Sequence, residues 1–384
     1  MRRTGSLCSL LLLAAVMPLA AQQVPVQQLA RPEVEFPDPF DQVTSVRELR
    51  DGRLIVADLY ARAVSLVDFA SGQATAIGRE GQGPKEFGFP VALVPLPNDT
   101  TWLVDPAQNR FLVILPNGTP SGTVAFPDEF GGMARVKGAD ARGRIYAQGT
   151  GFTLGPGSDP RALPDSAPVV AWDRAARSVT PVGKVKIPAV AVSTSGSGGS
   201  RSVMMRQQPF PLADDWAVTS AGRVGFVRSG TYHVEWGAPA PRVGPPVAFK
   251  PVPVTAADKK ELEDRMKDSR GALRITRTDG NGSGQASSGP PPSQPAEPQV
   301  DWPEQKPPFV PTSAITSPEG EIWVERSQPA GAPELVDVFG PAGNLLRQVK
   351  LPPRTRLVAV GAKGIYAART DDDGLWYLQR YKKP

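Results

Sequence analysis

The sequence predicts an all-β protein, specifically a six-bladed β-propeller of four-stranded antiparallel blades with one short inserted helix. Three observations predict this fold. Glycine and proline (38 and 43 residues) form about a fifth of the 384-residue chain, which exceeds the usual ~12% and indicates many tight turns. Hydrophobic residues make up 40% of the chain, enough for a sizeable core. A turn followed by a short apolar strand recurs six times.

Each copy of the repeat consists of a turn, a strand and a companion strand, as in 51–58 followed by 64–67. The six turns are marked by Gly52, Asp99, Gly143, Gly222, Gly320 and Gly364. Their spacings are 47, 44, 79, 98 and 44 residues. Three of these intervals match one four-stranded propeller blade, and the two long ones contain insertions. Strands that alternate apolar and polar residues between Gly, Asn and Asp turns are typical of hairpins.

The sixth copy is one strand short, while the stretch 24–36 has no partner beside the first blade. We therefore expect 24–36 to form the outermost strand of the sixth blade, which would close the ring and remove a free sheet edge. Six of the seven tryptophans fall on predicted strands. Packing between blades explains them better than a ligand cage does.

Residues 1–21 are typical of a secretory signal peptide, because Arg2 and Arg3 precede the apolar run 7–16 and small residues follow it. The apolar run is shorter than the ~20 residues that span a bilayer. We therefore expect an exported protein, periplasmic or extracellular, with no membrane span. Residues 22–384 would then form a single propeller domain, and we expect it to be a monomer.

Composition excludes several classes of site. A single histidine excludes mechanisms that need two or three imidazoles, and a single cysteine excludes disulfide frameworks and Cys-cluster zinc sites. The formal charge is +5, of which two charges belong to the expected signal peptide. The remaining basic residues are scattered, so we expect no nucleic-acid partner. His233 is interpreted as a structural residue, and no catalytic residue or metal ligand is assigned.

A resemblance to a known family rests on the segment 78–87, Gly-Arg-Glu-Gly-Gln-Gly-Pro-Lys-Glu-Phe, with Pro90 after it. This segment resembles the loop between blades in NHL-like six-bladed β-propellers. Three further segments are similar to that family, the last to its exported bacterial members: 56–64, 104–111 and 323–343. The resemblance covers roughly residues 40–382 and implies the fold. It implies little about chemistry, because one propeller scaffold carries many functions.

Loop lengths predict which end of the propeller binds. In a meandering blade, the turns between strands one and two and between strands three and four share one end, and all other connections share the opposite end. Every long connection belongs to the second set: 78–90, 150–167, 187–209, 249–308 and 327–333. Binding loops usually gather in this way on a rigid scaffold.

The largest insertion, 250–308, has two predicted parts. Thr255 and Asp258 form a capping pattern that opens a helix over about 256–270. Residues 278–308 contain 8 prolines, 4 glycines and 4 serines, a composition that favours a disordered tether.

Acidic residues end predicted strands at the elaborated end of the propeller: Asp58, Asp105 and Glu325. Their oxygens could converge on Ca²⁺, or each could bind backbone amides of its own loop, which we favour. Four arginines lie near these carboxylates and could pair with them or receive an anionic ligand: Arg62, Arg110, Arg228 and Arg369. Arg79 and Glu86, in the 78–90 loop, complete the candidate ligand-binding residues.

Two functions follow from these observations. The first is an exported, non-enzymatic binding module or scaffold without a cofactor, which recognises a peptide, glycan or protein through the face with the long loops. The alternative is a Ca²⁺-dependent, lactonase-like hydrolase with its site at the central channel, as in propellers of the gluconolactonase kind. The alternative requires at least three oxygen ligands from different blades at one depth of the channel.

Overall fold

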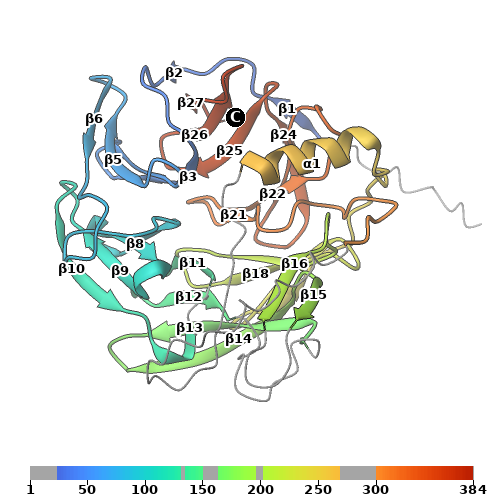
Figure 1. The fold of residues 1–384 in the computed structure, drawn as a ribbon, viewed down its shortest axis with the longest axis horizontal. Helices are drawn as coiled ribbons and strands as arrows, with labels where there is room; N and C mark the ends of the chain where they lie inside the picture. Colours follow the sequence, from blue (N-terminus) through green and yellow to red (C-terminus); the bar gives the residue numbers. More distant parts are fainter. Residues whose placement is uncertain (1–23, 131–134, 150–162, 196–201, 269–299, 384) are drawn as a thin grey trace, which may run out of the picture.

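Six sheets, five of four strands and one of five, surround a central axis in the computed structural model of the protein (Figure 1). The structure describes residues 24–130, 135–149, 163–195, 202–268 and 300–383. The predicted fold class, an all-β six-bladed propeller with one short inserted helix, is confirmed. The expected signal peptide at 1–21 and most of the expected tether at 278–308 lie outside the described residues.

The blades follow one another along the chain, and each of the first five runs from its inner to its outer strand. The first blade contains β3 (Val43–Glu48), β4 (Leu54–Asp58), β5 (Ala63–Asp68) and β6 (Gln73–Ala76). The second contains β7 (Ala92–Pro95), β8 (Thr101–Asp105), β9 (Arg110–Ile114) and β10 (Pro120–Ala125). The third contains β11 (Arg135–Ala139), β12 (Ile145–Gln148), β13 (Ser166–Asp173) and β14 (Ser178–Lys186).

The second half of the ring repeats this order. The fourth blade contains β17 (Asp215–Val218), β18 (Val224–Arg228), β19 (His233–Trp236) and β20 (Arg242–Val243). The fifth contains β21 (Ile315–Thr316), β22 (Ile322–Arg326), β23 (Leu335–Phe339) and β24 (Leu345–Lys350). The sixth contains β25 (Thr355–Val360), β26 (Ile365–Thr370), β27 (Trp376–Tyr381) and the N-terminal strand β2 (Val34–Glu35). The first strands of neighbouring blades contact one another all round the axis.

The N-terminal stretch 24–36, predicted to lie in the sixth blade as a whole, is divided between two blades. Strand β2 pairs antiparallel with β27 as the fourth strand of the sixth blade. Strand β1 (Val26–Gln28) instead pairs in parallel with β24, as a fifth strand of the fifth blade. The apolar anchors explain the division, because Leu29 is buried between the fifth and sixth blades, and Phe36 between the sixth and first.

The core consists of six clusters of buried apolar side chains, one between each pair of neighbouring blades. The six strand tryptophans all take part in these clusters: Trp102, Trp172, Trp216, Trp236, Trp323 and Trp376. Their predicted packing role is therefore confirmed. Because each cluster joins two blades, face-to-face packing of apolar side chains holds neighbouring blades together all round the ring.

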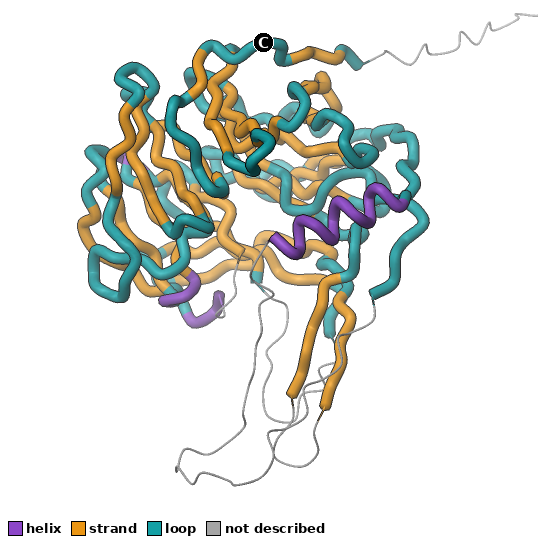
Figure 2. Tube along the Cα trace, turned by 45° about the horizontal axis from the view of Figure 1, so that its top comes forward, coloured by secondary structure: helices purple, strands orange, loops and turns teal. Residues whose placement is uncertain are grey.

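The two ends of the propeller differ. We name the end with the short turns the turn face, and the end with the other connections the loop face. On the turn face, Gly52, Gly143 and Gly320 have φ of 96°, 81° and 79°, which only glycine adopts at little cost. On the loop face, β15 (Val190–Ser195) and β16 (Ser202–Gln207) form a hairpin that projects away from the blades (Figure 2). The helix α1 (Ala256–Asp268) belongs to the same face, because its segment connects the fourth and fifth blades.

Candidate functional site

The loop-face ends of the second strands carry two of the predicted carboxylates. Asp58, at the end of β4, accepts hydrogen bonds from the backbone amides of Asp41 (2.7 Å) and Gln42 (3.0 Å). Asp105, at the end of β8, accepts bonds from the amides of Gly88 (2.9 Å) and Phe89 (3.0 Å). Both side chains are buried. Each carboxylate therefore fixes the segment that enters its own blade, which satisfies the buried charge through several amide donors.

Three of the predicted residues come together in the loop that joins the first two blades. The Arg79 Nε lies 2.7 Å from Glu86 Oε1, and Glu86 Oε2 accepts a bond of 2.8 Å from the amide of Gly83. Arg110 donates to the carbonyl oxygens of Gly83 (2.8 Å) and Glu86 (2.9 Å). Arg110 therefore stabilises the conformation of the 78–90 loop. Arg79 is 80% exposed, so most of its guanidinium faces solvent.

Two other predicted arginines belong to different blades, and each pairs with a glutamate near it. Arg62 forms an ion pair with Glu80 beside the first blade. Arg369, on β26, donates two bonds to Glu35 on β2, at 3.0 and 3.1 Å. The hydrogen bond from Arg369 holds the pKa of the Glu35 carboxyl below its ordinary value. Arg369 therefore helps to attach the N-terminal strand to the sixth blade.

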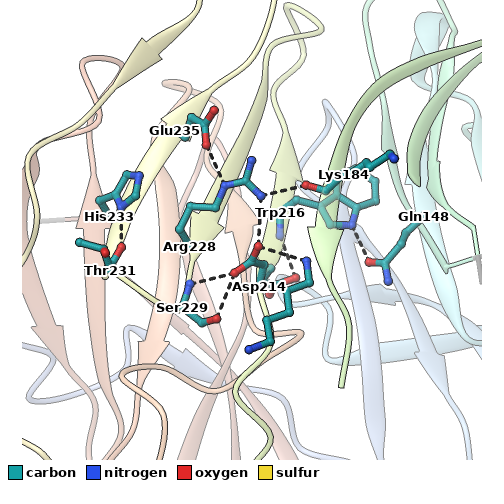
Figure 3. Close-up of polar contacts among 11 residues, drawn as sticks. Gln148, Lys184, Asp214, Trp216, Arg228, Ser229, Thr231, His233 and Glu235 are labelled. Carbon is teal, nitrogen blue, oxygen red and sulfur yellow. Dashed lines mark hydrogen bonds and ion pairs between the residues drawn. The ribbon is translucent and has the colours of Figure 1, made fainter. Parts of the chain in front are cut away.

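Arg228 lies in a network on the fourth blade (Figure 3). Its guanidinium donates to Glu235 (2.8 Å), to the carbonyl oxygen of Lys184 (2.8 Å) and to Asp214 (3.1 Å). The same Asp214 accepts bonds from both the amide and the hydroxyl of Ser229. The fourth blade lacks an aspartate at the end of its second strand, and Asp214 takes over the binding of a loop amide from the opposite side. The sequence pattern could not reveal this exchange, because the aspartate precedes its blade.

The remaining predicted residue, Glu325, belongs to a carboxyl pair at the loop-face end of the fifth blade. Its Oε2 lies 3.6 Å from Arg356 Nη2, on the inner strand of the sixth blade. Glu334, which sequence reasoning missed, lies beside it and accepts bonds of 3.3 Å from the amide of Leu357. Burial, together with the charge of Glu325, raises the pKa of Glu334 to about 8, while Arg356 acts in the opposite direction.

A second group missed from the sequence joins three blades at the axis. Lys137 Nζ on β11 lies 2.6 Å from Asp215 Oδ1 on β17 and donates to the carbonyl oxygen of Ala314 before β21 (3.0 Å). Asp215 Oδ2 accepts a bond of 2.7 Å from the amide of Ala314. Burial and the nearby Arg135 lower the pKa of Lys137 to about 7, against the attraction of Asp215. No local pattern could have revealed a pair separated by 78 residues.

The predicted carboxylates do not converge on one point. Within the described ranges, no three His, Cys, Asp or Glu side chains come close enough to hold a metal ion. Asp58, Asp105 and Glu325 belong to the first, second and fifth blades, and the first two already use their oxygens on backbone amides. The hypothesis of a Ca²⁺ site built from these three residues gains no support.

The blade order and the pairing of the strands define the protein as a six-bladed β-propeller. Among solved structures it is similar to regucalcin, a calcium-binding protein from Agrobacterium tumefaciens (12% identity, 94% of this chain and 97% of that one, TM-score 0.42). It is also similar to a gluconolactonase from Xanthomonas campestris (11%, 92% and 97%, TM-score 0.41) and to a candidate exported protein from Bacteroides fragilis (11%, 94% and 99%, TM-score 0.46). No protein-family model and no curated protein matches the sequence.

Among the residues that the structure describes, no helix is long and apolar enough to cross a membrane. The one described α-helix, α1, is charged over most of its length and has Asp258 in its first turn.

Proposed function

We propose that this chain is an exported, non-enzymatic β-propeller of the NHL-like type, a monomer that binds a peptide, glycan or protein through its loop face. The observation that carries the proposal is the asymmetry between the two faces. The turn face is reduced to short turns, whereas a projecting hairpin, a helix and the longest connections gather on the loop face. Loops placed on a rigid scaffold are where binding residues usually lie.

A firm attachment of these elements to one another supports the proposal. Asp258 of α1 forms an ion pair of 2.6 Å with Lys306 and accepts a bond of 2.8 Å from the amide of Ala330. Lys306 also donates to the carbonyl oxygen of Gln328 (2.7 Å). The helix, the returning segment 300–308 and the connection 327–334 thus form one layer. A layer that is ordered before binding loses less conformational entropy when a partner arrives.

Exposed apolar side chains on the same face add a second line of support. Eight large apolar residues are exposed in the part of the chain that the structure describes. Four of them lie on loop-face connections: Tyr60, Phe89, Leu212 and Phe249. Aromatic side chains bury much surface at little entropic cost, and they are enriched in protein interfaces.

The experiment compares the two faces with defined probes. Residues 22–384 are screened against an array of glycans and a displayed library of random 12-residue peptides, and each ligand found is titrated by calorimetry. The variants Tyr60→Ala and Phe89→Ala should weaken binding at least tenfold, whereas Leu115→Ala, an exposed apolar residue on the turn face, should leave it unchanged. Ligands that bind both loop-face variants as tightly as the native protein would contradict the proposal.

A lactonase-like hydrolase is the second candidate, and the carboxyl pair Glu325 and Glu334 favours it. Two neighbouring carboxyl groups, one of them with a raised pKa, are a common arrangement for acid–base catalysis. The test is the melting temperature in EDTA and in millimolar Ca²⁺, followed by lactone hydrolysis. A ligand at 100 times its Kd stabilises a protein by about 2.7 kcal/mol. The hydrolase would be favoured over the binding module if Ca²⁺ raised the melting temperature of the native protein but not of Glu325→Gln, and if the native protein hydrolysed lactones.

A further inference from the structure

A cleft between the second and third blades is lined by none of the nine candidate site residues. Its volume is about 370 Å³. Its walls come from the segment after β10 and from the β13–β14 hairpin: Pro127, Glu129, Trp172, Arg174, Arg177 and Val179. Ligand pockets start at about 300 Å³, so the cleft has room for a ligand of one or two sugar rings.

Two arginines on one wall have no acidic partner in the described chain. Arg174 and Arg177 flank the turn between β13 and β14, and both are exposed. The nearest carboxylate along the chain, Asp173, accepts a bond of 3.0 Å from the amide of Ala176, so it caps the turn. The Arg174 guanidinium lies over the ring of Trp102, 6.0 Å from its centroid. Both arginines line the same cleft, and a guanidinium group pairs well with a carboxylate.

The aromatic wall of the cleft is fixed by its neighbours. The ring of Trp172 stacks on Phe111, with centroids 6.2 Å apart and planes inclined by 15°. It also contacts Phe130 edge-on at 5.8 Å and Trp102 at 6.3 Å. Trp172 is only 8% exposed, and the part that lines the cleft cannot rotate away. A preformed wall of this kind lowers the cost of binding a flat, weakly apolar surface.

The opposite wall determines what else the ligand must carry. Glu129 is exposed and lines the cleft. Its carboxylate accepts hydrogen bonds from hydroxyl groups and repels a ligand whose charge is spread over its whole surface. A ligand that fits therefore has an anionic group at one end, hydroxyls at the other and C–H surface between them.

We propose that this cleft binds a sugar unit that carries a carboxylate, that is, a uronic acid residue. Arg174 and Arg177 hold the carboxylate, Trp172 with Pro127 and Val179 contacts the C–H face of the ring, and Glu129 accepts bonds from the hydroxyls. This site uses none of the residues on which the function proposed above depends. It therefore does not depend on the function proposed above, and either can fail alone.

The test is calorimetric titration of residues 22–384 with digalacturonic acid, with neutral galactobiose as the uncharged probe and sodium sulfate as the anion without a sugar. Hydrogen bonds to charged groups are among the stronger ones, so Arg174→Ala and Arg177→Ala should each weaken the binding of digalacturonic acid about tenfold or more. The matched control Arg242→Ala removes an exposed arginine from the outer strand of the fourth blade and should bind like the native protein. All variants should melt like the native protein, because the substituted side chains are exposed.

Three results would overturn the proposal. The first is no heat of binding with digalacturonic acid at millimolar concentration. The second is binding that Arg174→Ala and Arg177→Ala leave unchanged, which would place the sugar elsewhere. The third is sulfate or galactobiose binding as tightly as digalacturonic acid. Tight binding of sulfate would mean that the cleft recognises only the charge, and tight binding of galactobiose that it recognises only the sugar.

Discussion

Single carboxylates at the loop-face ends of the blades behave in two opposite ways. Asp58 and Asp105 accept hydrogen bonds of 2.7–3.1 Å from two or more backbone amides each. Within the described part of the chain, Glu334 accepts from one backbone amide, that of Leu357, and lies near a second carboxylate, Glu325. An acid with few donors and a like charge beside it favours its neutral form. The difference depends on the number of amides supplied by neighbouring segments, which a sequence does not display.

The first prediction concerns Glu334 and pH. Its pKa is about 8 in the folded protein against an ordinary value of 4.5, so the folded state holds an extra proton between these values. The stabilisation is complete below about pH 4.5 and is lost as the pH rises through 8. Glu334→Gln keeps a neutral side chain, and we expect it to stabilise the protein by about 1–3 kcal/mol at pH 9 relative to pH 5. Urea unfolding at both values measures this.

Exposed Glu304→Gln is the matched control and should shift stability equally at both pH values. The buried Lys137 titrates in a neighbouring range with the opposite effect, because its lowered pKa makes stability rise with pH above about 7. Comparing each variant with the native protein at the same pH cancels that contribution. If Glu334→Gln changed the free energy of unfolding equally at pH 5 and pH 9, the pKa of the Glu334 carboxyl would not be raised in the folded protein.

The second prediction concerns Asp105. Replacing it by alanine leaves the amides of Gly88 and Phe89 without their acceptor, and each buried, unsatisfied polar group costs about 1–3 kcal/mol. We expect Asp105→Ala to lower the free energy of unfolding by about 2–4 kcal/mol in EDTA, measured in urea. Exposed Asp128→Ala should change it by less than about 0.5 kcal/mol. Loss of stability seen only in the presence of Ca²⁺ would instead make Asp105 a metal ligand.

Among the elements, α1 shows how a local signal and a distant contact combine. The Thr255 hydroxyl accepts from the Asp258 amide at 3.4 Å, and the Thr255 amide donates to the Asp258 carboxylate at 2.8 Å, as in a capping box. That pair is visible in the sequence. The ion pair of Asp258 with Lys306 is not, because 48 residues separate the two. Burial of Asp258 acts to raise its pKa, but the bonds from Lys306 and Thr255 hold that pKa far below the ordinary range.

The third prediction concerns this attachment. Lys306→Met removes the partner of a buried carboxylate, an uncompensated loss that costs about 3–5 kcal/mol. We expect α1 to detach before the propeller unfolds, since its contacts are with loops. Amide exchange over 256–268 and 327–334 should accelerate at least tenfold, measured by mass spectrometry, while blade strands stay protected. Lys260→Ala, in an exposed pair with Asp264, should leave exchange over 327–334 unchanged, and equal acceleration in both variants would count against docking through Lys306.

At the scale of the whole molecule, the sequence predicts the repeated strands and turns, but it does not predict the side-chain contacts between different blades. Turn spacing and two-residue periodicity are local, so the six blades and the burial of Trp216 or Trp323 follow from them. The nine candidate residues lie at strand ends and connections, yet their partners depend on how the blades close. Lys137 with Asp215 and the cleft at Trp172 arise from contacts between different blades, and the split of 24–36 depends on which blade buries Leu29 and which buries Phe36.

The last prediction concerns closure of the ring. Strands β1 and β2 cover the outer edges of the fifth and sixth blades, and Phe36 is fully buried. Burying a phenylalanine contributes about 3–5 kcal/mol, so Phe36→Ala should lower the unfolding free energy by that amount. Val26→Ala, at a residue that is 57% exposed, should change it by less than about 0.5 kcal/mol.

A chain that starts at residue 38 exposes both edges, and unpaired edges recruit strands from other chains. We therefore expect it to associate with increasing concentration in light scattering, and a shortened chain that stays monomeric and equally stable would show that the ring closes without these strands.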